Sequence, residues 1–525
     1  MMKRKTKLIL AGLASLFLWL SWPAGGFAPL LFIAFVPLLW IENYFIENPH
    51  LKKKELFGLN YLSMLLWNAF STWWVCNASF GGGIFAIMAN SLFMAIILQL
   101  FHFTNSKVKN NFAYVTLPIY WIAFECLHLH WEASWPWLTL GNGFAAVASW
   151  VQWYEFTGVL GGSMWIWLVN ILIFLALKQQ PSQKKIKTYY PALVIILPLA
   201  FSLARYYSYS EKMAPVNIVV TQPNIDPYNE KFSGLSNEEQ LIRILQLANL
   251  EVNDSTDYVL APETAIPYSM WEDELNDYHE IKLIQHFLGA RPRLKILIGA
   301  STNKAYPNGE KSITARKLKS KDVYYDSYNT ALYFEKDKSI QLFHKSKLVP
   351  GVEKMPYPQL FGFLQNLAID MGGTSGSLGV QDEPSVFSSS IGKVAPVICY
   401  ESVYGEYVAE YILKGAQWIA IVTNDGWWGN SPGYRQHVQY ARLRAVEMRR
   451  SIARSANTGI SCFINQKGDI SQATPYWQDA VISQSINKND DITFYAKHGD
   501  YIGWFACLLF FPMLMVTIAF KSKSK

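Results

Sequence analysis

Long apolar runs in the first 205 residues constrain this chain more than any other feature. A helix needs about 20 apolar residues to cross the ~30 Å hydrocarbon core of a bilayer. Residues 1–205 also contain only six carboxylates and no Asp. The chain is therefore predicted to cross a membrane eight times. The runs, two of them short, lie near 8–22, 28–47, 56–76, 83–103, 112–130, 163–178, 190–204 and 501–520.

Lysine and arginine are confined to alternate connections between these runs. Cationic connections resist translocation and stay on the cytoplasmic side. With the N-terminus inside, the outer connections 23–27, 77–82 and 131–162 contain neither Lys nor Arg. This asymmetry predicts cytoplasmic termini and places residues 206–498 outside. The inner cations are Lys3, Arg4, Lys5, Lys7, Lys52, Lys53, Lys54, Lys107, Lys109, Lys178, Lys184, Lys185, Lys187, Lys521, Lys523 and Lys525.

Composition divides the chain into three predicted parts. Residues 1–205 form a transmembrane domain of seven crossings, 206–498 a soluble domain, and 499–525 a last crossing with a cytoplasmic tail. Charged residues make up 16% of the chain, below the roughly 25% typical of soluble proteins. The net charge of +7 is explained by lysines that flank the crossings. Because no basic stripe with interleaved aromatic residues is present, nucleic acid is not an expected partner.

The outer connection 131–162 is rich in Trp and Gly and includes WPWLTLG at 135–141. Trp is favoured at the headgroup level of a membrane, so this segment could form an interfacial aromatic belt. It could equally be a re-entrant segment that faces a lipid-filled cleft. Glu125, His128 and His130 lie just before it. Without further carboxylates, we interpret them as packed or interfacial residues and not as metal ligands.

Five short runs rich in β-branched residues follow from residue 216. Continuous apolar runs that alternate with amphipathic stretches indicate buried strands covered by helices, an α/β arrangement. Two antiparallel hairpins are also expected, at 329–348 and at 455–470, the second with its turn at 466–468. The five predicted strands lie within 216–225, 257–267, 295–301, 393–402 and 418–427.

Three predicted strands lead into a chemically useful side chain: Glu263, Lys345 and Cys399. Each has an ordinary explanation, because charged residues are mostly exposed and a free Cys is among the most buried residue types. Together they supply a thiol, a base for its proton and a cation for an oxyanion. Acyl transfer through a thioester needs these roles. A thiol with a pKa of about 8.5 is mostly protonated at neutral pH, so a base or cation beside it matters.

The five cysteines include no CxxC pair, so a zinc site of the usual spacing is absent. Cys76, Cys126 and Cys507 lie in or beside apolar runs and are predicted to be packing residues. A disulfide framework is not expected, although the sequence leaves a Cys399–Cys462 pair open. We therefore expect neither a metal nor a cofactor.

Glu263, Lys345 and Cys399, in this order at strand ends, resemble the Glu-Lys-Cys triad of the nitrilase (carbon–nitrogen hydrolase) superfamily. Within it, the chain is more similar to the apolipoprotein N-acyltransferase family, over nearly its whole length. The similar stretches are WPWLTLG (135–141), APETAIP (261–267), HKSKLVPGVEKMP (344–356), ICYES (398–402), TNDGWWGNSPGYRQHVQYARLRAVEMRR (423–450) and RSANTGIS (454–461).

The resemblance implies a nitrilase-like αββα sandwich on an eight-helix transmembrane domain, with the catalytic domain in the periplasm and both termini inside the bacterial inner membrane. It implies an acyltransferase. Cys399 would take an acyl chain from the sn-1 ester of a phospholipid as a thioester. The free α-amine of a diacylglyceryl-cysteine on an apolipoprotein would then receive it. Glu263 would act as base and then acid, while Lys345 and the Tyr400 N–H would stabilise the oxyanion.

The resemblance also assigns supporting residues and shows departures. Lys347 stands where the family often has His, and 350–353 permutes its Pro-Phe-Gly-Glu. Lys345 and Lys347 could exchange roles, but the spacing to Leu-Val-Pro favours Lys345. Trp427 and Trp428 could line the acyl path or simply pack. The supporting residues are Glu353, Tyr400 and Glu401, and the candidate substrate contacts are Phe232 (where Trp is common), Trp427, Trp428 and Trp137.

Two other functions remain. A membrane-tethered amidase or nitrilase that hydrolyses small amides outside the cell would keep the triad, but it would leave the eight crossings and the Trp-rich segment unexplained. A catalytically idle lipid-binding or scaffold protein is disfavoured by the intact triad. Because no oligomerisation signature is visible, we expect a monomer.

Overall fold

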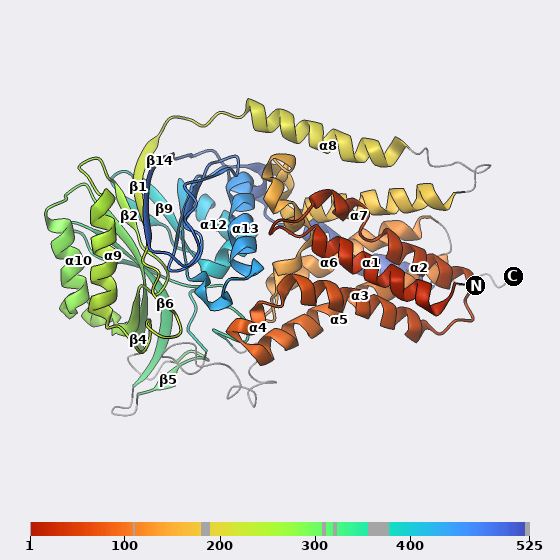
Figure 1. The fold of residues 1–525 in the computed structure, drawn as a ribbon, viewed down its shortest axis with the longest axis horizontal. Coiled ribbons are helices and arrows are strands. Elements are labelled where there is room, and N and C mark those ends of the chain that lie inside the picture. Colours follow the sequence, from red (N-terminus) through yellow and green to blue (C-terminus); the bar gives the residue numbers. More distant parts are fainter. Residues whose placement is uncertain are drawn as a thin grey trace. The chain divides into compact units, whose positions relative to one another are not determined.

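The computed structural model describes residues 2–108, 111–179, 189–306, 311–318, 323–354, 357 and 377–519. The chain divides into two compact units (Figure 1). The first comprises Met1–Trp73, Gly83–Tyr209 and His498–Lys525, and the second comprises Trp74–Gly82 and Ser210–Lys497. Several residues used in the predictions lie outside the described residues, namely Lys109, Lys184, Lys185, Lys187, Met355, Pro356, Lys521, Lys523 and Lys525.

The first unit is helical. Its elements are α1 (Arg4–Leu20), η1 (Ala28–Phe32), α2 (Val36–Glu47), α3 (Lys53–Thr72), α5 (Phe80–Val108), α6 (Ala113–His130), η2 (Pro136–Leu138), η3 (Leu140–Trp150), α7 (Tyr154–Lys178), α8 (Tyr189–Ser208) and α15 (Tyr501–Ala519). Five described segments are long and apolar enough to cross a membrane: Ala28–Glu47, Phe80–Val108, Tyr154–Lys178, Tyr189–Ser208 and Tyr501–Ala519. The runs predicted at 8–22, 56–76 and 112–130 form α1, α3 and α6, which are helical but fall outside this set.

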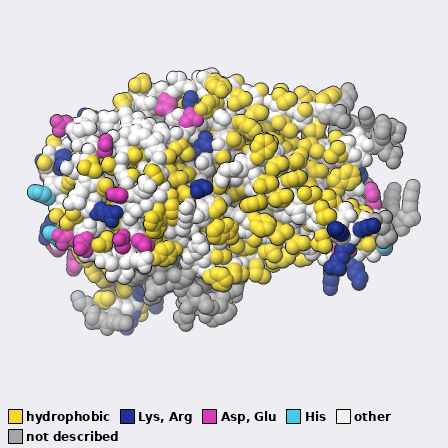
Figure 2. Space-filling model, in the orientation of Figure 1, with side chains coloured by type: hydrophobic (Ala, Val, Ile, Leu, Met, Phe, Trp, Pro, Cys, Tyr) yellow, Lys and Arg dark blue, Asp and Glu magenta, His cyan; other side chains and the backbone are white. Residues whose placement is uncertain are grey.

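The outer surface of this unit is apolar. Only 11% of the apolar window of α8 and 17% of that of α15 is buried. Leu508 and Phe511 of α15 are both 70% exposed. Hydrophobic side chains cover much of the visible face of this unit (Figure 2). A continuous apolar surface of this kind marks contact with another apolar phase, which is consistent with a membrane location.

The Trp-rich segment at 131–162 is buried more deeply than an interfacial aromatic belt would be. Helix α7 begins at Tyr154, well before residue 163, and contains a break at Gly158 with φ of 59°. Trp137 is 1% exposed and stacks on Trp135 at 5.7 Å between ring centroids. These rings pack in the protein interior, so an interfacial belt does not describe them.

Glu125 of α6 explains how this segment is held. Its Oε1 accepts hydrogen bonds from the Trp121 Nε1 at 2.9 Å and from the backbone N–H of Leu140 at 2.8 Å. Leu140 is the first residue of η3, whose initial N–H groups have no partner within the helix. Glu125 is therefore a packed residue that closes the start of η3.

The second unit contains two β-sheets. The first has the order β14-β1-β2-β4-β6-β5, with β3 paired to β4 and β7 to β6, and the second has the order β13-β12-β11-β10-β9-β8. Strands of the first sheet are β1 (Pro215–Gln222), β2 (Tyr258–Leu260), β3 (Ile266–Trp271), β4 (Lys295–Tyr306), β5 (Arg316–Lys317), β6 (Tyr324–Glu335), β7 (Gln341–His344) and β14 (Ala480–Asn487). Those of the second are β8 (Phe387–Ser389), β9 (Gly392–Ile398), β10 (Trp418–Thr423), β11 (Ile452–Ala456), β12 (Cys462–Ile464) and β13 (Ile470–Ser471).

These strands confirm the sequence pattern. The five predicted runs overlap β1, β2, β4, β9 and β10, and both hairpins form as the antiparallel pairs β6/β7 and β12/β13. Strand β14, which was not predicted, pairs antiparallel with β1. The apolar runs become strands because both faces of each sheet are covered, which favours continuous β-branched stretches over alternating ones.

Helices cover the outer face of each sheet. Helices α9 (Asn237–Glu251) and α10 (His279–Gly289) pack on the first sheet, and α12 (Gly405–Leu413) and α13 (Pro432–Met448) pack on the second (Figure 1). The sheets face one another directly. Tyr258 of β2 meets Trp418 of β10 at 5.0 Å between ring centroids, and the Ser455 hydroxyl donates to the Thr221 carbonyl. The result is the expected αββα sandwich.

Gly299 of β4 allows the segment after β2 to cross the sheet closely. A Cβ at this position would lie 2.5 Å from the Thr264 N and 2.6 Å from the Glu263 Cα. Both are backbone atoms, which cannot move aside independently. Glycine is therefore required here by close approach, and it sets the position of Glu263.

We predict that Gly299→Ala lowers the free energy of unfolding by about 1–3 kcal/mol, because overpacking displaces the backbone. Gly289→Ala is a matched control, since a Cβ there meets nothing within 4 Å and Ala favours a helix over Gly. Thermal unfolding of both variants in detergent measures the effect. Equal midpoints would contradict the steric argument.

Candidate active site

Glu263, Lys345 and Cys399 all lie in the second unit at ends of strands. Glu263 lies three residues after β2, Lys345 directly follows β7, and Cys399 directly follows β9. Strand β2 is parallel to β4, and β7 returns to that direction through two antiparallel pairings with β6. The carboxyl ends of β2 and β7 therefore meet at one edge. The three side chains are buried, with residues 6%, 1% and 7% exposed.

The Lys345 ammonium lies between two carboxylates. Its Nζ is 2.9 Å from the Glu263 Oε1 and 2.8 Å from the Glu353 Oε1. The Asn329 Nδ2 donates to the same two oxygens, at 2.7 Å and 3.3 Å. We call Glu263, Asn329, Lys345 and Glu353 the carboxylate cage. The cage includes two predicted members of the triad and the predicted supporting residue Glu353.

The charged groups of the cage stabilise one another in their ionised forms. Burial alone would lower the pKa of Lys345, but Glu263 and Glu353 raise it well above its usual value. Burial likewise opposes ionisation of Glu263, yet the Lys345 charge and hydrogen bonds from Lys345 and Asn329 hold the pKa of Glu263 below its usual value. Glu263 is therefore a carboxylate at neutral pH and can accept a proton.

Cys399 has a strained backbone and a protonated thiol. Its φ is 51°, a left-handed conformation that costs on the order of 1–3 kcal/mol in a non-glycine residue. Burial, and next the negative charge of Glu263, raise the pKa of Cys399 well above its usual value, while Lys345 partly opposes them. The resting site thus combines a thiol with an ionised carboxylate, an arrangement for general-base catalysis.

Glu401 connects the nucleophile turn to the lysine segment. Its Oε2 accepts the Ile398 N–H at 2.8 Å, and its Oε1 accepts the Ser346 N–H at 2.7 Å. Burial raises the pKa of Glu401 to about 7, against these backbone donors. Since Ile398 precedes Cys399 and Ser346 follows Lys345, Glu401 fixes the two catalytic candidates relative to one another. Tyr400 is 3% exposed and packs on Tyr404.

Two family models match this chain. The carbon-nitrogen hydrolase model matches residues 220–491, and the model of the apolipoprotein N-acyltransferase N-terminal domain matches residues 14–172. Apolipoprotein N-acyltransferase of Chlorobaculum tepidum is 33% identical over 494 residues, which cover 92% of this chain and 90% of the relative. The chain belongs to the apolipoprotein N-acyltransferase family.

A second relative and a solved structure are also similar to this chain. Apolipoprotein N-acyltransferase of Geobacter metallireducens is 26% identical over 533 residues, covering 98% of this chain and 96% of the relative. Among solved structures, Saccharomyces cerevisiae Nit3, a member of branch 10 of the nitrilase superfamily, aligns with a TM-score of 0.37 and 15% identity. That alignment covers 55% of this chain and 96% of Nit3.

Lys347 lies outside the carboxylate cage. Its Nζ lies 5.6 Å and 5.2 Å from the ring centroids of Tyr404 and Tyr407, an arrangement in which the ring faces attract the cation. Lys345, in contrast, bonds both carboxylates. The geometry therefore favours Lys345 over Lys347 for the triad position.

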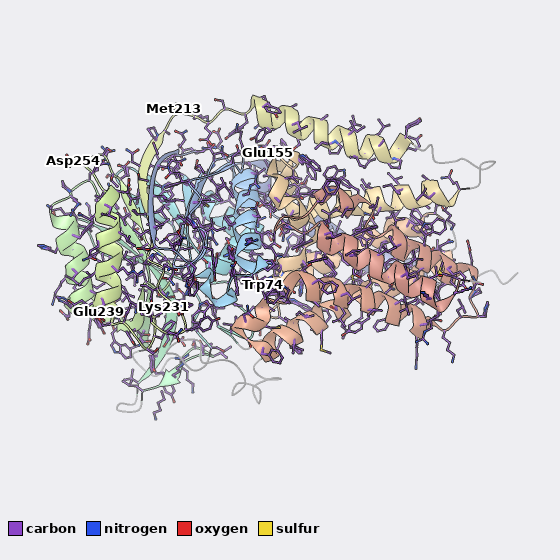
Figure 3. All side chains as sticks on the ribbon, viewed as in Figure 1. Trp74, Glu155, Met213, Lys231, Glu239 and Asp254 are labelled. Carbon is purple, nitrogen blue, oxygen red and sulfur yellow. The ribbon has the colours of Figure 1, made fainter. Side chains whose placement is uncertain are left out.

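A second buried cation lies beside the cage and was not predicted. Lys231 (labelled in Figure 3) is 1% exposed, and its Nζ donates to the backbone carbonyl of Glu263 at 3.0 Å. Burial lowers the pKa of Lys231 to about 8, and the Glu263 charge partly offsets this. The only sequence signal was its position directly before Phe232.

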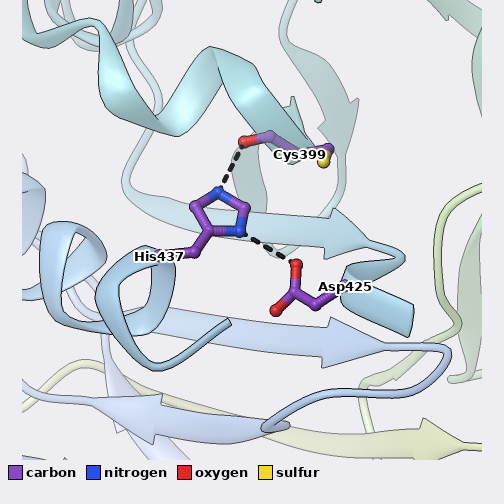
Figure 4. Close-up of side chains that lie close together, drawn as sticks. All are labelled: Cys399, Asp425 and His437. Atoms are coloured by element: carbon purple, nitrogen blue, oxygen red, sulfur yellow. Dashed lines mark hydrogen bonds and ion pairs between the residues drawn. The ribbon is translucent and has the colours of Figure 1, made fainter. Parts of the chain in front are cut away.

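Asp425, His437 and Arg454 form a buried ion cluster next to the backbone of Cys399; Figure 4 shows the first two. The His437 Nδ1 is 2.9 Å from the Asp425 Oδ1, and its Nε2 is 3.2 Å from the Cys399 carbonyl oxygen. The ligand atoms of Cys399, Asp425 and His437 lie within 4.8 Å of one another, a spacing that would suit a metal. The Arg454 Nη2, however, bonds the Asp425 Oδ2 at 2.7 Å and approaches the His437 Nδ1 at 3.1 Å. A guanidinium therefore already supplies the positive charge beside these ligands.

Asp425 is the central acceptor of this ion cluster. It also accepts the Thr423 hydroxyl at 2.9 Å. Burial opposes its ionisation, but Arg454 and His437 lower the pKa of Asp425 to about 2. Through the contact of His437 with the Cys399 carbonyl, the cluster helps to hold the turn that begins at Cys399. Its members lie within the stretches 423–450 and 454–461 that resemble the family, but no pattern predicted their contact, because they come from three elements: η9 (Asp425–Trp428), α13 and β11.

The candidate substrate contacts fall into different environments. Half-buried Trp427 stacks on Phe232 at 6.1 Å and accepts the Tyr228 hydroxyl on its carbonyl. Trp428 packs against Trp74 and His437, which supports its interpretation as a packing residue. Trp137 belongs to the first unit and is buried there. Cys399 and Cys462 are both free thiols.

We predict that Asp425→Asn lowers the free energy of unfolding by about 3–5 kcal/mol, because it leaves the fully buried Arg454 without its counter-ion. The matched control is Glu383→Gln, whose ion pair with Lys414 is exposed to solvent and therefore contributes little to stability. Thermal unfolding of both variants is the measurement. Similar midpoints would show that the cluster is not an essential support.

Proposed function

We propose that this protein is an N-acyltransferase of lipoprotein maturation. It transfers a fatty acyl chain from a phospholipid, through a thioester on Cys399, to the free α-amine of the diacylglyceryl-cysteine of apolipoproteins. The observation that carries the proposal is a buried Cys399 thiol close to the Glu263 carboxylate, which Lys345 and Asn329 hold by hydrogen bonds. Similarity to apolipoprotein N-acyltransferases across both units supports the choice of substrates.

In the first step, Cys399 attacks the ester carbonyl while its proton passes to Glu263. The negative charge that develops on the carbonyl oxygen is stabilised by Lys345 and the Tyr400 N–H, as preorganised donors do in other acyl transfers. Collapse of this intermediate breaks the ester bond. Glu263 returns the proton to the departing alkoxide, which leaves a lysophospholipid and an acyl-enzyme.

In the second step, the amine attacks the thioester carbonyl. Glu263 removes a proton from the nitrogen, Lys345 again stabilises the oxyanion, and the Cys399 thiolate leaves and is reprotonated by Glu263. Glu353 keeps Lys345 in place in both steps. Trp427 and Phe232 contact the lipid substrates in this proposal, while Trp428 and Trp137 support the two units from within.

Placement in the bacterial inner membrane completes the proposal. The chain crosses eight times as a monomer, with both termini cytoplasmic and residues 206–498 in the periplasm. Lysine asymmetry and the exposed apolar faces of α8 and α15 support this topology. Both substrates are lipid-anchored and reach the site by lateral diffusion. Burial of Cys399 also supports the acyltransferase over the tethered amidase, because water must be excluded from the thioester between the steps.

We predict a fatty-acyl adduct on the purified protein incubated with phospholipid, detected by intact-mass spectrometry and released by hydroxylamine. Cys399→Ala abolishes the adduct because the nucleophile is absent, while Cys462→Ala, which removes another buried free thiol, retains it. A diacylated lipopeptide with a free amine discharges the adduct and water does not. Hydrolysis of small amides without an adduct would instead establish the tethered amidase.

We also predict that Lys345→Met reduces acyl-enzyme formation by at least about 100-fold, the loss typical of a removed oxyanion donor. Lys347→Met, which changes a lysine two residues away, reduces it by less than about tenfold, because its cation–π contact lies outside the carboxylate cage and supplies only about 0.5–1 kcal/mol. Rates of adduct formation at equal protein concentration test this. The reverse order would assign the catalytic role to Lys347.

A further inference from the structure

Asn329 occupies a central place in the carboxylate cage, although the reaction described above assigns it no role. It lies within β6, where its backbone carbonyl accepts the Lys345 N–H at 2.8 Å. Its side-chain amide donates to Glu263 and Glu353. One residue therefore contacts all three charged members of the cage.

The orientation of this amide is determined by its surroundings. Both neighbouring carboxylate oxygens are acceptors, so the NH₂ group and not the carbonyl must face them. The Asn329 Oδ1, at the other end, is buried without a hydrogen-bond partner among the described residues. A buried polar atom without a partner is uncommon and needs an explanation. An asparagine retained for packing alone would be expected to satisfy both ends.

The hydrogen bonds to Glu263 are one-sided. Among the described residues, Lys345 and Asn329 donate hydrogen bonds to this carboxylate, and both donate to Oε1. Oε2 is then the oxygen left to receive a proton. Because two donors fix Oε1, rotation of the carboxylate is restricted and the direction of Oε2 is defined.

We propose that Asn329 is a positioning residue that clamps Oε1 of Glu263 and thereby presents Oε2 to the thiol of Cys399. The inference rests on the proposed function, because it assigns Glu263 as the base in both half-reactions. Asn is suited to this place: it donates a hydrogen bond without adding charge. Asp, which has the same shape, would lack the donor and add a third carboxylate to the cage.

The pH dependence of acyl-enzyme formation tests this role, because its acid limb reports the pKa of Glu263. Charged and titratable groups that face Glu263 are Lys345 after β7, Glu353 in the following turn, Lys231 in the loop after β1, and Cys399 after β9. Asn329 is a neutral donor among them, and its hydrogen bond lowers the pKa of Glu263. Its removal raises that pKa, so the acid limb of the rate profile moves to higher pH.

The experiment measures acyl-enzyme formation against pH by intact mass, with phospholipid as donor. We expect Asn329→Ala to shift the acid limb upward by about one pH unit, as loss of a hydrogen bond to a charged group implies. Asn329→Asp shifts it further and loses about 10- to 100-fold of the rate at neutral pH, within the range of general-base effects, but recovers at higher pH. Asn303→Asp on neighbouring β4, whose Oδ1 accepts the Ser327 hydroxyl outside the cage, leaves the limb unchanged.

Each outcome has a distinct meaning. A lower rate with an unshifted limb in both Asn329 variants would overturn the inference and leave a structural role only. Should Asn329→Ala not fold, Asn329→Ser provides the same test, because its short side chain cannot bridge both carboxylates. Failure of the wild-type protein to form any adduct would instead contradict the proposed function, which separates the two hypotheses.

Discussion

A single buried ammonium, that of Lys345, holds the candidate site together. The Lys345 ammonium and the Glu263 carboxylate are buried here and Glu353 is half-buried, and each buried charge would be costly alone. Their contacts at 2.8 and 2.9 Å make the burial tolerable. Loss of one partner from such a pair typically costs about 3–5 kcal/mol, since the other charge stays buried. The strand ends that carry Glu263 and Lys345 are thereby joined electrostatically as well as by the sheet.

Cys399, the proposed nucleophile, comes from the second sheet and is connected to the Lys345 segment by hydrogen bonds. Glu401 connects the Cys399 turn to the segment after Lys345, and the Asp425–His437–Arg454 cluster contacts the same turn through the Cys399 carbonyl. A strained residue persists only where its surroundings over-determine its conformation. Here two polar contacts provide that constraint on the φ of Cys399: Glu401 accepts the N–H of Ile398, and His437 contacts the Cys399 carbonyl.

Sequence patterns predicted the parts of this protein that depend on local chemistry. The five β-branched runs became strands. Two of them lead into Glu263 and Cys399, and an arm of the first hairpin leads into Lys345, so these candidates had a visible signature, a functional group at a rigid strand end. Asn329 has none, since it lies within β6 and acts only through residues brought to it by strand pairing. The interior packing of Trp135 and Trp137 likewise depends on tertiary contacts, because Trp is common at membrane surfaces too.

The protonated state of Cys399 suits an enzyme with lipid substrates. A resting thiolate at this buried position would need solvation that the site does not supply, whereas Glu263 carries the same charge with two hydrogen-bond donors already in place. In the proposed reaction, the proton passes to Glu263, and the attraction between Glu263 and Lys345 weakens as negative charge develops on the substrate oxygen. The same cation would then stabilise the carboxylate first and the oxyanion second. The total charge in the site stays constant throughout, so no ion has to enter from water while the thioester forms.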